Sequence, residues 1–321
     1  MSLIEVKEVS NSLNEQLVLN KLSLAVEERD NLAIVGETGS GKSTLLKTIG
    51  GLLDVDQGAV LFNEKRILGP KDTLIAGHDE IIYLSQHFEL PKFITVLEHL
   101  DYEYKMGEEE AYQIFKACQI EHLLDKNTRQ LSGGEKQRVA LVKELLKSPK
   151  VLLIDEPFSN LDFIHKQTIK ETLEELKKMD DLTVIMVSHE PRDVLPWADK
   201  VVVMKDGGII QSDTPQNVYG QPKNEYVAGL FGKYNLIEIE NWPTDQIAGC
   251  AKIDGKMLVR PEQIVIEAND TSSISAAVEK VNYYGSNYEV IASFSSQKLV
   301  IEVPSADFKV GDKVSLRIKK H

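Results

Sequence analysis

The sequence contains few cysteines and no long apolar run. Its 321 residues include two cysteines, Cys118 and Cys250, which lie in separate segments. This usage argues against a disulfide framework and favours a reducing compartment. No apolar run approaches the ~18–20 residues that a membrane-spanning helix needs. The N-terminus lacks the basic-then-apolar pattern of a secretory signal, so we expect a soluble chain that is not exported.

Excess positive charge and early aromatic residues are also missing. The chain has 37 Lys and Arg against 50 Asp and Glu, a formal net charge of −13, which disfavours broad non-specific binding to nucleic acid. No Phe, Tyr or Trp occurs before Phe62. The hydrophobic fraction of 42% is that of an ordinary globular protein, and the length suggests about two domains.

A glycine-rich segment is the strongest motif present. It follows the apolar run 32–35, which predicts a buried strand, and it precedes a run that predicts a helix. A phosphate-binding P-loop requires this order, because its glycines let backbone N–H groups point at phosphate oxygens. Lys42 supplies a charge for the β- and γ-phosphates, and the Ser43 hydroxyl suits Mg²⁺. The alternative, a flexible turn beside a surface lysine, is disfavoured by the flanking strand and helix. The expected phosphate contacts are Gly36, Glu37, Thr38, Gly39, Ser40, Gly41, Lys42, Ser43 and Thr44.

Polar residues close three other predicted strands. Asp155 and Glu156 follow the apolar run 151–154, where two adjacent acids are costly to bury unless they are paired or bound to metal. Asp155 can hold Mg²⁺ through its water shell, and Glu156 can accept a proton from an attacking water. The alternative is that both acids cap the next turn. His189 could donate a hydrogen bond to a γ-phosphate, and Gln86 could bind Mg²⁺ and sense the third phosphate.

The order of the remaining segments predicts the fold class. Buried strands alternate with helices to about residue 230, which predicts a layered α/β domain. Within it, residues 87–130 favour helices, one of them opened by Glu108–Glu110 and burying Cys118. Beyond residue 235, short alternating strands separated by turn residues predict a small all-β barrel.

Taken together, these segments resemble the nucleotide-binding subunits of ABC transporters. Order and spacing agree over roughly residues 3–235. The signature sequence is the most specific match, because other P-loop families lack it. The matching positions are residues 36–43 for Walker A, 131–138 for the LSGGQ-type signature with Glu135 in the fifth place, 152–156 for Walker B and its catalytic glutamate, 159–162 for the D-loop, His189 for the H-switch and Gln86 for the Q-loop.

The resemblance implies how such a chain would work. Two subunits would pack head to tail and bind ATP and Mg²⁺, with Ser43, Gln86 and Asp155 at the metal. The homodimer would hydrolyse ATP at Glu156 and energise a separate transmembrane permease that docks near the Q-loop. A solute-binding protein would be an indirect partner, and no nucleic acid is expected. The chain would be cytoplasmic, peripheral on the cytoplasmic face of the membrane. The residues that would close over the partner's ATP are Ser132, Gly133, Gly134 and Asp162.

One position departs from the family pattern. An aromatic residue upstream of Walker A stacks on adenine in the family, and spacing places that position near Leu13. Base stacking would therefore be replaced here by aliphatic contact.

The C-terminal part carries a second resemblance. Residues 258–264 and 311–314 resemble the TOBE barrel appended to many bacterial importer ATPases. This implies an ABC nucleotide-binding domain at 1–235, with a helical subdomain at about 87–130, and a single OB-like barrel at 236–321. Import rather than export rests on this resemblance. The barrel would support the dimer or regulate it, with small-molecule sensing as the alternative to a passive scaffold.

Two other functions stay open at this point. A soluble ABC ATPase acting on nucleic acid or ribosomes would usually carry tandem cassettes, coiled-coil insertions or basic arms, and none is visible in the sequence. A regulatory module without turnover is disfavoured because Asp155, Glu156 and His189 are all present.

Overall fold

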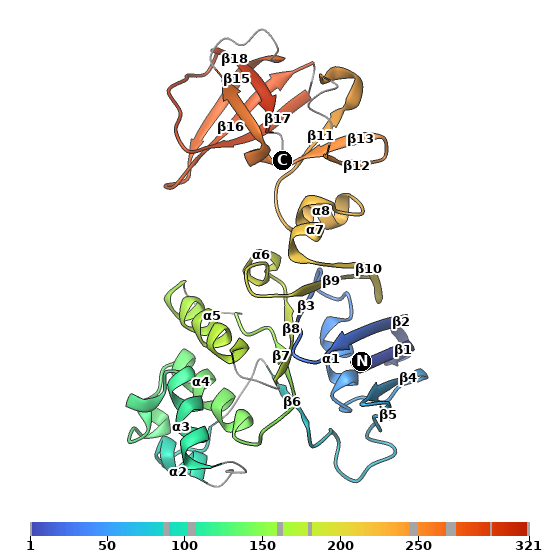
Figure 1. Cartoon of the computed structure of the whole chain (residues 1–321), viewed down its shortest axis with the longest axis vertical. Coiled ribbons are helices and arrows are strands. Elements are labelled where there is room, and N and C mark those ends of the chain that lie inside the picture. The colour runs from blue at the N-terminus through green and yellow to red at the C-terminus, as the bar shows by residue number, and fades with distance from the viewer. Residues whose placement is uncertain are drawn as a thin grey trace. The chain divides into compact units, whose positions relative to one another are not determined.

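The structure is a computed structural model that describes residues 2–85, 90–101, 107–158, 163–178, 182–243, 249–267, 274–295 and 297–319. The chain divides into two compact units, residues 1–215 and 216–321, each of which is described by itself (Figure 1). No helix in the described part of the chain combines the length and apolar character needed to cross a membrane.

The first unit is built on a central sheet with the strand order β10-β9-β3-β8-β7-β6. Strands β9, β3, β8, β7 and β6 run parallel, and β10 pairs antiparallel with β9. Every residue of β3, β7 and β8 is buried, as expected for parallel strands covered on both faces. The strands are β3 (Asn31–Val35), β6 (Ile81–Leu84), β7 (Val151–Asp155), β8 (Thr183–Ser188), β9 (Lys200–Lys205) and β10 (Gly208–Asp213).

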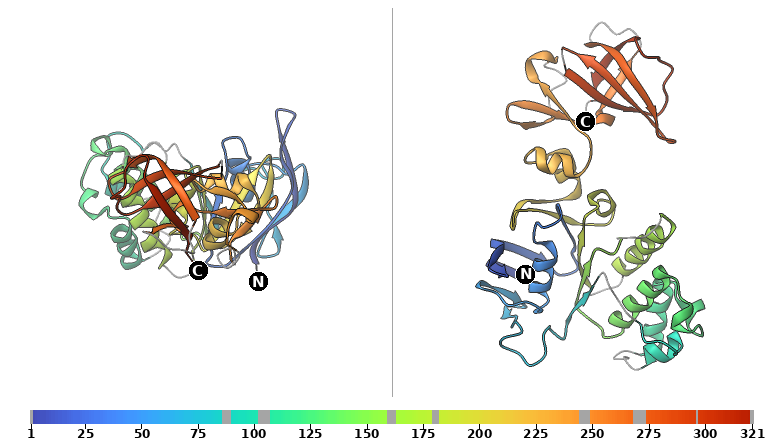
Figure 2. Two further views of the ribbon diagram at one scale, coloured as in Figure 1. Left: turned by 90° about the horizontal axis from the view of Figure 1, so that it is seen from above. Right: turned by 180° about the vertical axis from the view of Figure 1, so that it is seen from behind.

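An antiparallel sheet with the order β2-β1-β4-β5 lies on one side of the central sheet (Figures 1 and 2). One cluster of buried side chains joins the two sheets and helix α1 (Lys42–Ile49), including Val6, Leu45 and Ile185. Helix α1 is therefore fixed from both sides. The strands are β1 (Ser2–Leu13), β2 (Gln16–Glu27), β4 (Gln57–Phe62) and β5 (Lys65–Arg66).

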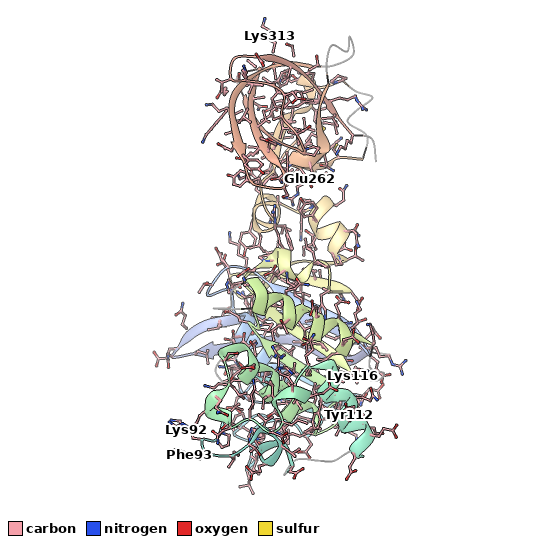
Figure 3. All side chains as sticks on the ribbon, turned by 90° about the vertical axis from the view of Figure 1, so that its left-hand side faces the viewer. Lys92, Phe93, Tyr112, Lys116, Glu262 and Lys313 are labelled. Atoms are coloured by element: carbon pink, nitrogen blue, oxygen red, sulfur yellow. The ribbon has the colours of Figure 1, made fainter. Side chains whose placement is uncertain are left out.

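Helices occupy the other side of the central sheet (Figure 2). The predicted acidic first turn of α3 is confirmed, since α3 begins at Glu108. Its inner face is buried, whereas Tyr112 and Lys116 point outward (Figure 3). Cys118 caps α3 and is fully buried, and burial raises the pKa of its thiol to about 12, so its prediction as a core residue is confirmed. The helices are α2 (Val96–Leu100), α3 (Glu108–Ala117), α4 (Gly133–Leu145), α5 (Phe163–Lys177) and α6 (Pro191–Val194).

The second unit contains two short helices and two antiparallel sheets. The sheets have the orders β11-β13-β12 and β14-β18-β15-β16-β17, and their inner faces share one core that includes Trp242, Val290 and Leu316. The elements are α7 (Pro215–Gly220), α8 (Glu225–Leu230), β11 (Asn235–Glu238), β12 (Ala251–Ile253), β13 (Lys256–Val259), β14 (Ile264–Glu267), β15 (Ile274–Tyr283), β16 (Tyr288–Phe294), β17 (Gln297–Val303) and β18 (Lys313–Ile318).

A buried arginine fastens the two helices to this β structure. Arg260 follows β13, is 1% exposed and stacks on the Tyr219 ring with its guanidinium carbon 4.2 Å from the ring centre. Its guanidinium donates to the carbonyls of Tyr219, Ala228, Gly232 and Lys233 at 2.9 to 3.2 Å. These carbonyls lie at the C-terminal ends of α7 and α8, where unpaired acceptors and the negative end of the helix dipole favour a cation.

Candidate active site

The loop between β3 and α1 has the backbone of a phosphate cradle. Gly36 has φ +154° and Gly41 has φ +96°, which side chains rarely adopt. A Cβ on Gly36 would lie 2.3 Å from the Met204 carbonyl oxygen, and one on Gly41 would lie 2.9 Å from the Val18 carbonyl oxygen. Both positions therefore require glycine, for conformation and for close approach.

The turn between β9 and β10 fastens this loop to β2. The Gly207 N–H donates to the Ser40 carbonyl at 3.2 Å, and the Gly207 carbonyl accepts from the Asn20 N–H at 3.0 Å. A Cβ on Gly207 would lie 2.4 Å from the Val18 carbonyl oxygen. The P-loop, the turn and β2 are thus held together through backbone atoms.

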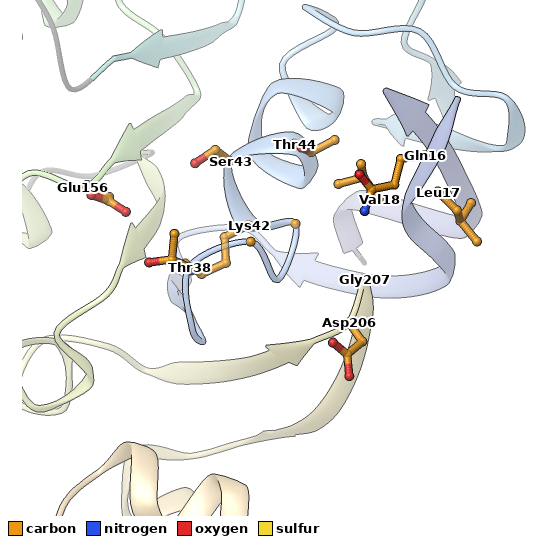
Figure 4. Close-up of a pocket in the computed structure, with 12 residues that line it drawn as sticks. Gln16, Leu17, Val18, Thr38, Lys42, Ser43, Thr44, Glu156, Asp206 and Gly207 are labelled. Atoms are coloured by element: carbon orange, nitrogen blue, oxygen red, sulfur yellow. The ribbon is translucent and has the colours of Figure 1, made fainter. Parts of the chain in front are cut away.

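A pocket of about 550 Å³ opens in front of the α1 N-terminus (Figure 4). Glu156 lies on the Ser43 side of this space, and Gln16, Leu17 and Val18 lie on the opposite side. The motif-based prediction found the first side but not Gln16–Val18 or the 206–207 turn, which are distant in sequence. The lining residues are Gln16, Leu17, Val18, Thr38, Gly39, Gly41, Lys42, Ser43, Thr44, Glu156, Asp206 and Gly207.

Lys42 is a buried cation whose partners are neutral. Its ammonium donates to the carbonyls of Gly36 and Glu37, each at 2.8 Å, and lies 3.5 Å from Ser40 Oγ. Burial lowers the pKa of Lys42, and the negative charges of Glu156 and Asp155 oppose that shift. An anion in the pocket would supply the charge that the carbonyls do not.

Asp155 receives a hydroxyl donor on each carboxylate oxygen. Ser43 Oγ donates to Oδ1 at 3.0 Å, and Tyr83 Oη donates to Oδ2 at 2.9 Å. Burial and the bond to Asp155 raise the pKa of Tyr83, so the phenol keeps its proton. Tyr83 was missed by the motif-based prediction, because it lies inside an apolar strand.

Glu156 adopts a strained backbone beside His189. Its φ of +52° falls in the left-handed region, which is uncommon for residues other than glycine and costs of order 1–3 kcal/mol. The Glu156 N–H donates to the Val187 carbonyl at 3.0 Å, and His189 Nδ1 lies 3.3 Å from Glu156 Oε2. This geometry directs the Glu156 carboxylate into the pocket, next to the imidazole.

Comparison with known proteins identifies the family of this chain. The family model described as ABC transporter matches residues 19–159, and the TOBE domain model matches residues 257–321. The sulfate/thiosulfate import ATP-binding protein CysA 2 of Shewanella oneidensis is 30% identical, with 95% of this chain and 92% of the relative covered. The chain belongs to the ATP-binding subunits of ABC transporters.

Two further similarities are to a full-length relative and to a solved structure of an ATP-binding cassette. The spermidine/putrescine import ATP-binding protein PotA of Mycoplasma capricolum is 29% identical, with 99% of this chain and 95% of the relative covered. A dimeric structure of the ATP-binding cassette MJ0796, in a post-hydrolysis state with ADP and Pi, is 27% identical with a TM-score of 0.55. It covers 66% of this chain and 98% of that one. The predicted cassette fold and TOBE domain are confirmed.

The ABC signature segment starts helix α4 and is not part of the pocket lining. Ser132 caps α4: its Oγ accepts from the Glu135 N–H at 3.3 Å, and Glu135 Oε2 accepts from the Ser132 N–H at 2.7 Å. Lys126 Nζ lies 3.2 Å from Glu135 Oε1. Burial opposes ionisation of Glu135, but the bonds from Ser132 and Lys126 lower its pKa overall, so it is charged.

Gln86 of the Q-loop and Asp162 of the D-loop lie outside the described residues. Leu13 ends β1, pairs with Gln16 and is 38% exposed, and it is not among the residues that line the pocket. The aliphatic residues that do line it on this side are Leu17 and Val18.

Proposed function

We propose that this chain is the ATP-hydrolysing subunit of an ABC importer. The observation that supports it most directly is the pocket itself, which is lined by the phosphate cradle, Lys42, Ser43 and Glu156. Asp155 accepts a hydrogen bond from Ser43, and His189 lies next to Glu156, so both are adjacent to the pocket lining. Phosphate oxygens would take the N–H groups of residues 36–44, and Lys42 would turn from its loop carbonyls to the β- and γ-phosphates.

Mg²⁺ would be held by Ser43 and Asp155, with Gln86 completing the set. No group of three or more His, Cys, Asp or Glu side chains in the described residues could hold a metal alone. A hydroxyl and a carboxylate suit Mg²⁺, because this ion keeps several waters and takes other ligands from substrate phosphates. When bound, it would neutralise charge on the transferred phosphoryl group.

Glu156 would accept a proton from the attacking water, and His189 would donate a hydrogen bond to the γ-phosphate. The position of Glu156 in the pocket lining, next to His189, supports this assignment. Gly36, Glu37, Thr38, Gly39, Ser40, Gly41 and Thr44 would bind nucleotide phosphates, and Leu13 would lie near adenine together with Leu17 and Val18.

A head-to-tail homodimer would complete each site. Gly133 has no positive φ, and a Cβ there would meet nothing within 4 Å, so its own fold does not demand glycine. Close approach of a ligand held by the partner would explain it. We assign Ser132, Gly133, Gly134 and Asp162 to the partner's ATP, with the dimeric cassette MJ0796 as support.

The dimer would act on a transmembrane permease at the cytoplasmic face of the membrane, with a solute-binding protein as an indirect partner. The helical subdomain at about 87–130 would carry the permease contact in a cassette domain at 1–235, followed by the TOBE-like domain at 236–321. The two relatives are named for a polyamine cation and for sulfate anions at nearly equal identity. The proposal therefore extends to the class of importer and not to one solute.

Phosphate release tests the catalytic assignment. Glu156→Gln should reduce ATP hydrolysis at least about 100-fold, because general base catalysis contributes about 10²–10⁴-fold. Binding of Mg·ATP should persist. Glu80→Gln is the matched control, since Glu80 pairs with Lys150 on the surface. Normal turnover in Glu156→Gln would remove Glu156 from the mechanism.

Capture from membranes tests the transport assignment. Tagged Glu156→Gln, which should trap the ATP-closed dimer, is mixed with detergent-solubilised membranes with and without Mg·ATP, and bound proteins are identified by mass spectrometry. A multi-span permease recovered with ATP is expected. Ribosomal proteins or nucleic acid without any membrane protein would favour the soluble ABC ATPase instead.

A further inference from the structure

Tyr83 and Ser43 hold Asp155 from opposite sides. Tyr83 belongs to β6 and Ser43 to α1, and Asp155 ends β7 with 8% of its surface exposed. Strands β6 and β7 pair in parallel with Tyr83 beside Leu153, two residues before Asp155, so both side chains lie on the same face of the sheet. Each carboxylate oxygen thus has its own donor from a separate element.

Two donors on two oxygens restrict the carboxylate more than one donor can. With Ser43 alone, the Asp155 carboxyl group could rotate about its last bond while keeping one contact. The Tyr83 hydrogen bond to Oδ2 removes that freedom and keeps Oδ1 against Ser43 Oγ. Outer partners of this kind orient the groups that hold a metal and change metal affinity by about 10–100-fold.

We propose that Tyr83 is the positioning residue of the Mg²⁺ site: its hydroxyl fixes the Asp155 carboxylate in the orientation that holds the metal on bound ATP. The inference rests on the proposed function, because it takes Mg·ATP as the occupant of this pocket. Tyr83 acts through Asp155 and touches neither nucleotide nor metal.

The ring of Tyr83 has a separate, structural role. It packs against the core that joins the two sheets, and the Lys47 ammonium lies 5.9 Å from its centre. Tyr83→Phe keeps this ring and removes only the hydroxyl, so it separates packing from positioning. A purely structural hydroxyl would leave the metal dependence of nucleotide binding unchanged.

The test measures equilibrium binding of a fluorescent ATP analogue to the full chain, first in EDTA and then across a Mg²⁺ titration. Tyr83→Phe should bind the analogue normally in EDTA, and its half-saturating Mg²⁺ concentration should rise about 10-fold. Tyr219→Phe is the matched control, because it removes a 2.7 Å phenol–carboxylate bond to Glu262 in the second unit. An unchanged half-saturating concentration, or equal weakening in EDTA and Mg²⁺, overturns the proposal.

A double variant shows whether Tyr83 acts through Asp155. Tyr83→Phe combined with Asp155→Asn should have the same Mg²⁺ dependence as Asp155→Asn alone. Additive losses would mean an independent role and overturn the inference. Wild-type protein whose nucleotide binding ignores Mg²⁺ would instead defeat the proposed function, so the two failures are distinguishable.

Discussion

Each unit of this protein buries a cation against backbone carbonyls, but only one of the two cations borders a pocket. In the second unit, Arg260 donates to four carbonyls at the ends of α7 and α8. In the cassette, Lys42 donates to two carbonyls of its own loop and also borders a pocket. The contacts of Arg260 fasten elements together, whereas those of Lys42 can be exchanged for phosphate. Burial of a charge therefore does not by itself distinguish a structural residue from a functional one; an adjoining pocket does.

The largest expected effect concerns Lys42. Lys42→Met should reduce ATP hydrolysis by about 100-fold or more, because a preorganised charge at the phosphates is lost. The free energy of unfolding should change little, since Lys42 borders the pocket and water there can replace its ammonium at the Gly36 and Glu37 carbonyls. Phosphate release and urea denaturation measure the two quantities, with exposed Lys65→Met as control. Strong destabilisation by Lys42→Met would indicate that Lys42, like Arg260, has a mainly structural role.

Arg260 should show the opposite response. Arg260→Met leaves buried carbonyls without donors and should destabilise the second unit by at least about 1–3 kcal/mol, the cost of one unsatisfied buried polar group. ATP hydrolysis by the isolated protein should persist, because the nucleotide pocket is built from the first unit alone. Calorimetry reports the unfolding, with exposed Lys252→Met as control. Equal stability of the two variants would contradict a fastening role.

Lys126, in the ion pair at the start of α4, extends the comparison of Lys42 and Arg260 to a more exposed cation. Lys126 offsets the charge of Glu135 at a helix N-terminus that we assign to the partner's ATP. In a Glu156→Gln background, Lys126→Met should weaken ATP-driven dimerisation by about 2- to 5-fold, the range for an exposed pair. Sedimentation velocity measures the dimer fraction.

The rescue variant for this pair is Glu135→Gln. With the carboxylate removed, Lys126 has no charge to offset, so Lys126→Met should then have no further effect. If the double variant dimerises as poorly as Lys126→Met alone, Lys126 acts on something other than Glu135.

The smallest effect is expected at the base side of the pocket. Leu17→Tyr should tighten ATP binding by about twofold, because Leu17 would already contact the base and only part of the roughly 1–3 kcal/mol of an aromatic contact is gained. Leu13→Tyr should tighten it too, and by less, since Leu17 lines the pocket and Leu13 does not. Equilibrium binding without Mg²⁺ isolates this contact. Weaker binding in both variants would argue that adenine lies elsewhere.

Contiguous motifs made much of the cassette predictable. The P-loop, the Asp155–Glu156 pair and the buried parallel strands each occupy a short stretch whose spacing carries its chemistry, and the structure brings Lys42, Ser43 and Glu156 to one pocket. Tyr83 was missed because a hydroxyl in an apolar strand gives no local signal. The contacts of Val18 with Gly207 could not be predicted either, because they join residues about 190 positions apart through backbone atoms.

The same reasoning explains the misses in the second unit. Its alternating strands predicted the β structure, but α7 and α8 are short, and their attachment depends on Arg260 reaching carbonyls 27 to 41 residues away.

The backbone contacts of Gly207 fix the distance between β2 and the phosphate cradle. The Val18 carbonyl oxygen lies so close to both Gly41 and Gly207 that neither position has room for a Cβ, which keeps β2 from sliding against the phosphate cradle. The hydrogen bonds from Asn20 to Gly207 and from Gly207 to Ser40 join main-chain atoms, so a side-chain substitution does not lengthen or shorten them. Side-chain substitutions could change how strongly each end of a nucleotide in this pocket would be bound, but the main chain fixes the distance between β2 and the phosphate cradle.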